Sequence, residues 1–358
     1  MRTRFSPRKT LLAMALLLAA GCTEKLIKEE QPVPFPPPPS EPRFIYQRSI
    51  RGVVDFRRVT FFDKLFGVSV TDDLSKPFDV YASGDKVYIS DTGNRQVLVV
   101  DLKAEKVQPL GEFGADALQT PTGVRGAPDG TLYVADATRK LVQVYDAAGK
   151  VVRKIGSGKL TNPAGIALNI ELERLYVADL KTHTVKVFST MGEFLFTIGA
   201  EGGGGDDGQF VFPSFVAIDR RNGNVYVSDT NNFRVQVFDK DGTFLRKFGE
   251  LGDAPGYFQR PKGIALDSEG HCYVVENVFN NFQVFNDEGK VLTWIGFGGR
   301  RGPGVFYGPS GLYIDEQDRI YVVDALNKRI QVFQYLNAAW KQQNPALYDE
   351  LLSRSKAP

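Results

Sequence analysis

The chain has 358 residues, of which 42% are hydrophobic and 24% charged, so it is long enough for one large or two small globular domains and is not disordered throughout. Its formal charge is +2, and residues 1–21 hold four basic residues and no acid, so removing that segment leaves −2. This balance argues against a nucleic-acid-binding protein, which usually carries a clear basic excess. Two histidines and two cysteines are too few for a multi-histidine zinc centre or a disulfide framework.

The N-terminus has the pattern of an export signal. Basic residues occupy Arg2–Lys9, and the apolar run Leu11–Ala20 is too short to span a bilayer but has the length of a signal-peptide core. The sequence Leu18-Ala19-Ala20-Gly21-Cys22 resembles the bacterial lipoprotein signal, which implies cleavage after residue 21 and acylation of Cys22. Since Thr23 rather than aspartate follows Cys22, the resemblance implies an outer-membrane anchor, on the periplasmic or the surface side. The alternative is an ordinary secretory signal with an incidental cysteine.

Residues 22–42 are expected to form a linker after the lipidated cysteine. The segment is charged at first and then rich in proline, with the run Pro32-Val33-Pro34-Phe35-Pro36-Pro37-Pro38-Pro39. Such a run favours an extended polyproline II spacer of about 3.1 Å per residue. We expect it to hold the folded domain away from the membrane, and the alternative is a docking ligand for a proline-binding partner.

A short aromatic segment precedes the main domain. In Phe61-Phe62-Asp63-Lys64-Leu65-Phe66, apolar residues recur at helical spacing. This pattern fits either a short amphipathic turn that packs on the domain or a segment that inserts into the membrane surface. The sequence leaves the role of residues 56–76 open.

From residue 77 onward the chain repeats. Each repeat begins with a proline, and an acid follows 14 to 16 residues later with a tyrosine three residues before it. The prolines are Pro77, Pro121, Pro163, Pro213, Pro261 and Pro309; the acids are Asp91, Asp136, Asp179, Asp229, Glu276 and Asp324; the tyrosines are Tyr88, Tyr133, Tyr176, Tyr226, Tyr273 and Tyr321. A period of 42 to 50 residues is the signature of a repeat architecture.

Within each repeat the hydrophobic pattern alternates with period two between glycine-containing turns, as in residues 224–249. This predicts four short antiparallel strands per repeat, a to d, which is one propeller blade. Six such units predict an all-β fold, a six-bladed β-propeller of four-stranded antiparallel blades over residues 43–336. The last repeat lacks a fourth strand, whereas Arg43–Ile50 forms an unassigned strand before the first repeat. We therefore predict that this N-terminal strand completes the last blade and closes the ring.

The repeats resemble the NHL repeat, most clearly in Val225–Phe238 and Arg260–Asp267, and the whole resembles an NHL-type six-bladed propeller. The fourth and sixth units match best because arginines, Arg234 and Arg329, stand just after the strand b acids. The equivalent positions elsewhere are Gln96, Leu141, Thr184 and Asn281, so an Asp–Arg link is possible in two blades only. We expect these acids and arginines to be structural and to tie strand b to strand c.

After the propeller, residues 337–358 are expected to form a short helical tail. Asn344-Pro345 is a favourable N-cap and first-turn pair, and Leu347/Leu351 and Tyr348/Leu352 would share one side of the helix. The predicted organisation is thus a signal peptide over 1–21, a lipidated linker over 22–42, a propeller over 43–336 and a tail over 337–358.

The two faces of the predicted ring differ. The d-to-a and b-to-c connections emerge on one face, called here the loop-rich face, and the a-to-b and c-to-d turns on the other, the hairpin face. The loop-rich face combines aromatic, arginine and asparagine side chains, a composition typical of protein interfaces. Its candidate partner-binding residues are Arg139, Lys181, His183, Asn231, Phe233, Tyr257, Arg260, Asn280, Arg300, Arg301 and Lys328.

Chemistry-bearing motifs are sparse. The glycine-rich run 202–205 before Asp206 and Asp207 could hold calcium, but no ligand ladder follows, so a flexible loop is the preferred interpretation. Propellers with catalytic metals need acids or histidines where strands a enter the channel. The residues two after each proline include one acid and no histidine: Asp79, Gly123, Gly165, Phe215, Gly263 and Gly311. We therefore expect no enzyme, catalytic residue, metal or cofactor.

The resemblance implies a membrane-anchored extracytoplasmic binding or scaffold protein that uses its loop-rich face for protein–protein interaction in the cell envelope. The expected partners are envelope or exported proteins, with the membrane contacted through the N-terminal lipid and no nucleic acid bound. Two alternatives stay open: a propeller enzyme, such as a calcium-dependent hydrolase or lactonase-like protein, and a glycan-binding module.

Overall fold

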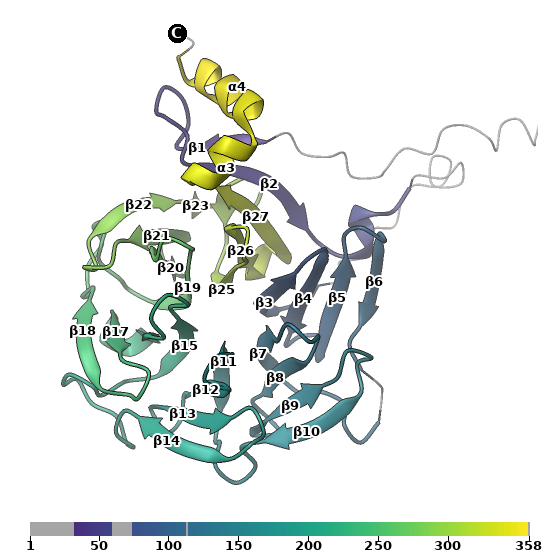
Figure 1. The fold of residues 1–358 in the computed structure, drawn as a ribbon, viewed down its shortest axis with the longest axis vertical. Coiled ribbons are helices and arrows are strands. Elements are labelled where there is room, and N and C mark those ends of the chain that lie inside the picture. The colour runs from purple at the N-terminus through teal and green to yellow at the C-terminus, as the bar shows by residue number, and fades with distance from the viewer. Residues whose placement is uncertain (1–31, 59–73, 112–113, 357–358) are drawn as a thin grey trace, which may run out of the picture.

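In a computed structural model, which describes residues 32–58, 74–111 and 114–356, the chain forms a ring of six blades around a central axis (Figure 1). The export signal, Cys22 and the segment Phe61–Phe66 lie outside the described residues. Blades 1 to 5 are four-stranded antiparallel sheets built from consecutive strands, and the predicted six-bladed all-β propeller is confirmed.

In blades 1 to 5 the strands run outward from the axis in chain order (Figure 1). Blade 1 contains β3 (Pro77–Ser83), β4 (Lys86–Asp91), β5 (Gln96–Asp101) and β6 (Lys106–Pro109); blade 2 contains β7 (Pro121–Gly126), β8 (Leu132–Asp136), β9 (Leu141–Tyr145) and β10 (Val151–Ile155). Blade 3 contains β11 (Pro163–Asn169), β12 (Arg174–Asp179), β13 (Thr184–Ser189) and β14 (Phe194–Ile198). Blade 4 contains β15 (Pro213–Ile218), β16 (Val225–Asp229), β17 (Arg234–Phe238) and β18 (Phe244–Phe248); blade 5 contains β19 (Pro261–Leu266), β20 (Cys272–Glu276), β21 (Asn281–Phe285) and β22 (Val291–Ile295).

Blade 6 joins the two ends of the chain, as predicted. It contains β25 (Pro309–Ile314), β26 (Arg319–Asp324) and β27 (Arg329–Tyr335), and the N-terminal strand β2 (Phe44–Ile50) pairs antiparallel with β27. Phe44, Ile45, Tyr46 and Ile50 of this strand are buried. The ring is therefore closed by a strand that lies nearly 300 residues before its partner in the sequence.

The proline-rich segment differs from the prediction of an extended spacer. Residues Val33–Phe35 form β1, which pairs antiparallel with β2 as a fifth strand of blade 6, and Arg43 N donates to Phe35 O at 2.8 Å. Proline is tolerated here because β1 is an edge strand, where a missing amide donor breaks no further ladder bond. The described part of the linker thus belongs to the folded domain.

The hydrophobic core lies between neighbouring blades. One cluster, for example, combines Ala167, Tyr176 and Val187 of blade 3 with Val216 and Phe238 of blade 4. The repeated tyrosines of strand b fill the same place in successive blades, and Tyr176, Tyr226, Tyr273 and Tyr321 are at most 2% exposed. Both faces of the middle strands are buried because each blade is packed between two neighbouring blades.

The acid at the end of each strand b is fully buried and fastens the loop before strand a. In blade 3, for instance, Asp179 accepts backbone hydrogen bonds from Thr161 N at 2.6 Å and Asn162 N at 2.8 Å. The predicted Asp–Arg links are also present, with Arg234 Nε 2.9 Å from Asp229 Oδ2 and the equivalent contact at 2.8 Å in blade 6. The repeated acids are structural, and their main partners are loop amides rather than strand c.

The remaining elements decorate the ring. They are the 3-10 turns η1 (Val53–Asp55), η2 (Thr230–Asn232) and η3 (Ala325–Asn327), the parallel pair β23 (Phe297–Gly298) and β24 (Val305–Phe306), and the helices α3 (Ala338–Gln343) and α4 (Pro345–Lys356). Helix α4 begins at Pro345, as the sequence pattern predicts, and Leu351 packs with Ile45 and Leu336 behind the closing strand. Within the part of the chain that the structure describes, no helix is long and apolar enough to cross a membrane.

Candidate functional site

The loop-rich face carries a ring of six residues in the left-handed backbone conformation, one in each blade. Each stands immediately before strand c, and the six φ values lie between 52° and 59°. The residues are Arg95, Lys140, His183, Phe233, Asn280 and Lys328. Side chains other than glycine and asparagine adopt this region at a cost of about 1–2 kcal/mol. These positions therefore retain a side chain where glycine would relieve the backbone, and retained strain of this kind marks candidate functional positions.

Four of the eleven sequence-predicted residues belong to this ring: His183, Phe233, Asn280 and Lys328. Two of them also serve the fold. His183 Nδ1 accepts from Phe212 N at 3.0 Å, and Asn280 Oδ1 accepts from Gly308 N at 2.8 Å. The ring members absent from the prediction were Arg95 and Lys140, and aligning the residue before strand c in all six repeats would have revealed them.

The other predicted residues divide into exposed side chains and one structural side chain. Lys181, Asn231, Tyr257, Arg260, Arg300 and Arg301 are exposed on the loop-rich face. Arg139 instead turns back onto its own blade, where Nε and Nη2 donate to Ala117 O at 2.9 and 2.6 Å. Arg139 thus holds the loop before β7.

Charge is divided across this face. Exposed cations occupy the connections of blades 6, 1 and 2, and we define the basic sector as Lys76, Arg95, Lys140, Arg300 and Arg301. Exposed acids occupy the loops before blades 4 and 5, at Asp206, Glu250 and Asp253, where they lie with the exposed cations Lys181 and Arg260. A surface divided in this way orients an approaching charged partner.

The aromatic residues of the long loops pack inward. Phe210, Phe258 and Phe306 are fully buried, each beside the first glycine after strand d of the preceding blade. The 202–208 loop is held rather than loose, since Arg234 Nη2 donates to Asp206 O at 2.9 Å and Lys247 Nζ pairs with Asp207. Across the described residues, no three acid, histidine or cysteine side chains converge as a metal site.

The central channel is filled near the loop-rich face. Phe78 of blade 1 and Phe215 of blade 4 stack with ring centroids 5.3 Å apart and an interplanar angle of 16°. At the same level Asp79 is fully buried and pairs with Arg125 Nη1 at 2.7 Å. Burial raises the pKa of the Asp79 carboxyl, and Arg125 opposes that effect. Asp79, the one acid among the residues two after each repeat proline, is therefore closed off from the loop-rich face.

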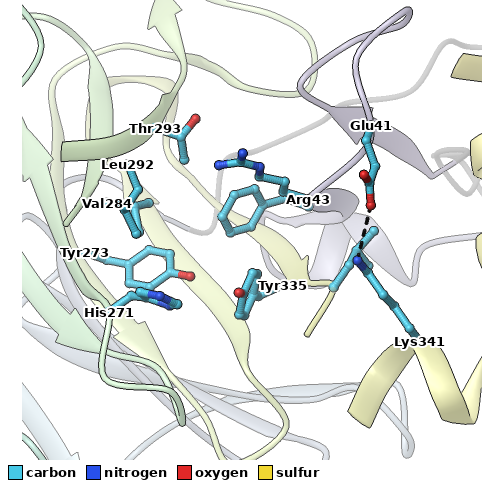
Figure 2. Close-up of a pocket in the computed structure, with 11 residues that line it drawn as sticks. Glu41, Arg43, His271, Tyr273, Val284, Leu292, Thr293, Tyr335 and Lys341 are labelled. Atoms are coloured by element: carbon cyan, nitrogen blue, oxygen red, sulfur yellow. Dashed lines mark hydrogen bonds and ion pairs between the residues drawn. The ribbon is translucent and has the colours of Figure 1, made fainter. Parts of the chain in front are cut away.

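A second candidate site lies where both chain ends meet blade 5 (Figure 2). Its cavity of about 270 Å³ lies among Glu41 and Arg43 before β2, His271 and Tyr273 of blade 5, Tyr335 of β27 and Lys341 of α3. Figure 2 shows Tyr335 facing His271 and Tyr273, with the Glu41–Lys341 ion pair on the opposite side.

The histidine in this cavity belongs to a motif of the repeat. His271 Nδ1 lies 2.9 Å from Asp267 Oδ2, to which Tyr273 OH also donates, and the bond to Asp267 raises the pKa of His271. In blade 6 the same arrangement is made by Arg319 and Tyr321 on Asp315. Since arginine takes the place of histidine in blade 6, the Asp267–His271 pair is primarily a structural element of the hairpin turn. Neither serine nor cysteine lines the described cavity as a nucleophile.

Comparison with known protein families supports the repeat assignment. The NHL repeat model matches residues 160–188, 210–238 and 306–333, which fall in blades 3, 4 and 6. NHL-repeat-containing protein 4 of Homo sapiens is 33% identical over 89 residues, covering 24% of this chain and 71% of that protein. Protein brain tumor of Drosophila melanogaster is 27% identical over 136 residues, covering 38% of this chain and 12% of that much longer protein.

Solved structures show the same fold at low identity. A protein of unknown function from Bacteroides thetaiotaomicron has a TM-score of 0.58 at 16% identity, over 74% of this chain and 70% of that one. An auxiliary nutrient binding protein from the same organism scores 0.57 at 14%, with the same coverage. Virginiamycin B lyase from Staphylococcus aureus scores 0.52 at 13%, over 72% of this chain and 94% of that one. These similarities show the propeller fold alone.

Proposed function

We propose, from the premise that this chain belongs to the NHL-repeat family, that it is a binding or scaffold protein whose loop-rich face docks an acidic surface of a protein in the cell envelope. The observation that carries the proposal is the ring of six left-handed positions, five of which hold a residue other than asparagine. A fold that needed only tight turns there would be more stable with glycine.

The charge distribution supports an acidic partner. The basic sector gathers five exposed cations from three adjacent blades on one side of the face. Exposed aromatic and amide groups, such as Tyr257 and Asn231, lie on the same face, so the surface combines steering charge with contact residues. The opposite sector is mixed, with Asp206, Glu250 and Asp253 beside Lys181 and Arg260, so it attracts an acidic partner less than the basic sector does.

Location is the second part of the proposal. We propose that Cys22 is acylated and tethers the propeller to the outer membrane, and that envelope or exported proteins are its partners. The support is the N-terminal sequence, with its basic start, its apolar run and its small residues before the cysteine. Changing Cys22 to serine should release the protein from washed membranes, and retention of the variant would contradict the anchor.

The docking proposal is tested by in-cell cross-linking and affinity capture of the tagged protein from native membranes. Reversing two charges of the basic sector, Arg300→Glu with Arg301→Glu, should abolish capture of a protein that the unaltered chain retains stoichiometrically. The matched control is Lys103→Glu with Lys106→Glu, two exposed lysines on the hairpin face. Equal capture by all three proteins, or loss in the control alone, would contradict the assignment of the docking face.

A further inference from the structure

A cavity in the channel opens on the hairpin face, on the side away from the proposed docking face. Its volume is about 570 Å³, within the range of small-molecule sites. Residues from all six innermost strands line it, so it occupies the axis of the ring. In Figure 1 these strands, β3, β7, β11, β15, β19 and β25, surround the centre.

The cavity exists because one residue position differs between the two halves of the ring. Four residues after the repeat proline, blades 3, 4 and 5 carry alanine, at Ala167, Ala217 and Ala265. Blades 1, 2 and 6 carry Tyr81, Arg125 and Tyr313 at that position. Tyr81 and Tyr313, whose rings meet edge to face with centroids 5.0 Å apart, therefore stand across the axis from three alanines, which leaves a slot between them. Leu168, Ile218 and Leu266 complete its apolar lining.

The slot is closed at the end that points toward the loop-rich face. The Phe78–Phe215 stack fills the axis there, and the innermost strands of neighbouring blades approach closely beside it. A Cβ atom on Gly263 would lie only 2.4 Å from Ser310 O of the next blade. Entry is thus from the hairpin face, where Arg220 of blade 4 reaches Tyr313 OH and Ile314 O of blade 6, both at 3.3 Å.

One wall presents an unused pair of hydrogen-bond donors. Arg125 is 7% exposed, its guanidinium lies 5.4 Å from the Tyr313 ring centroid, and Nη1 donates to Asp79 Oδ2 and to the carbonyls of Val80 and Val124. Among the described residues, Nε and Nη2 of Arg125 have no hydrogen-bond partner. These two atoms form the edge of a guanidinium that binds a carboxylate with two parallel bonds.

The charges around the slot leave Arg125 as the anchor for a single negative charge on the ligand. Inside the slot Asp79 pairs with one nitrogen of Arg125, and Asp219 is bonded twice by Arg221. At the mouth the exposed Arg220 stands beside two exposed carboxylates, Glu171 and Glu316, which would disfavour a second negative charge.

We propose that this slot binds a planar aromatic monocarboxylate, with the ring between the tyrosine and alanine walls and the carboxylate on the Nε/Nη2 edge of Arg125. The slot combines apolar side chains with a buried arginine as polar anchor and further polar groups toward its mouth, a combination typical of specific small-molecule sites. This function is separate from the proposed docking of a protein on the loop-rich face, and either can fail without the other.

The test is calorimetric titration of the purified full chain with 1-naphthoate and with its neutral isostere 1-naphthamide. We expect saturable one-to-one binding of the acid and at least tenfold weaker binding of the amide. Equal affinities would overturn the carboxylate assignment, and absence of saturable naphthoate binding would overturn the proposal.

The location of the site needs a variant that leaves the Asp79–Arg125 pair intact. Ala217→Leu adds bulk to the small-residue wall, and circular dichroism checks that the variant is folded. It should weaken naphthoate binding at least tenfold, whereas Ala104→Leu on an exposed turn should not. Unchanged binding by a folded Ala217→Leu variant would place the ligand elsewhere and overturn the assignment.

Discussion

Removing one side chain of the closing strand should destabilise the whole ring. Tyr46 is fully buried, its ring centroid lies 5.6 Å from that of Phe333, and its hydroxyl lies 2.8 Å from Ser49 Oγ. Truncating a buried aromatic side chain to alanine typically costs about 3–5 kcal/mol. Since a domain of this kind is stable by about 5–15 kcal/mol, Tyr46→Ala should remove a large share of the free energy of unfolding.

The assay is urea unfolding followed by two signals. Far-ultraviolet circular dichroism reports all six sheets, and fluorescence reports the two tryptophans, Trp294 in blade 5 and Trp340 in α3 beside the closing strand. If β2 closes one cooperative ring, both transitions should shift together to lower urea. Tyr46→Phe keeps the ring and loses only the hydroxyl contact, so it should cost about 0.5–1.5 kcal/mol.

Two results would refute this reasoning. A loss below about 1 kcal/mol in Tyr46→Ala would mean that the closing strand contributes little packing free energy. A shift of the fluorescence transition alone, with the circular dichroism transition unchanged, would mean that the strand and tail detach while the other blades stay folded.

Three further changes test other parts of the structure. Arg329→Ala leaves the buried Asp324 without its charged partner and should cost about 3–5 kcal/mol in urea unfolding, and a loss under 1 kcal/mol would contradict the role of that pair. Gly263→Ala should destabilise the ring because the new Cβ meets backbone of blade 6, whereas Gly205→Ala, with nothing within 4 Å, should be near neutral; equal effects would refute the close approach. The raised pKa of His271 gives stability that is full below about pH 6.5 and falls as pH rises through the raised value, so His271→Asn should flatten that dependence in melting curves from pH 5 to 9, and an unchanged slope would exclude the histidine as its source.

The fold was predictable because the same sequence pattern recurs in each blade. Proline at the start of strand a, a buried tyrosine and acid on strand b, and alternating strands recur six times, so local pattern and global architecture agree. The strand Val33–Phe35 was missed because prolines favour an isolated extended segment, and only the edge of an already formed blade makes pairing favourable there.

The candidate sites were less predictable because they depend on residues far apart in the chain. The left-handed ring could be read from one aligned position, but the cost of that conformation is a backbone property that sequence composition does not report. The channel slot depends on which blade carries alanine and which carries tyrosine around one axis. That arrangement, like the free edge of Arg125, becomes visible only when all six strands are placed together.

The pairing of β2 with β27 also sets the order in which the protein can mature. Strand β2 is made early but cannot take its place in the ring until β27 is made, almost at the end of the chain. Until then the apolar side of β2, with Phe44 and Tyr46, has no sheet to cover it, and the sixth blade stays incomplete. Contacts of such long sequence separation form late and slowly. The ring therefore cannot close before its last strand, β27, has been made, which is consistent with the export that we propose for this protein.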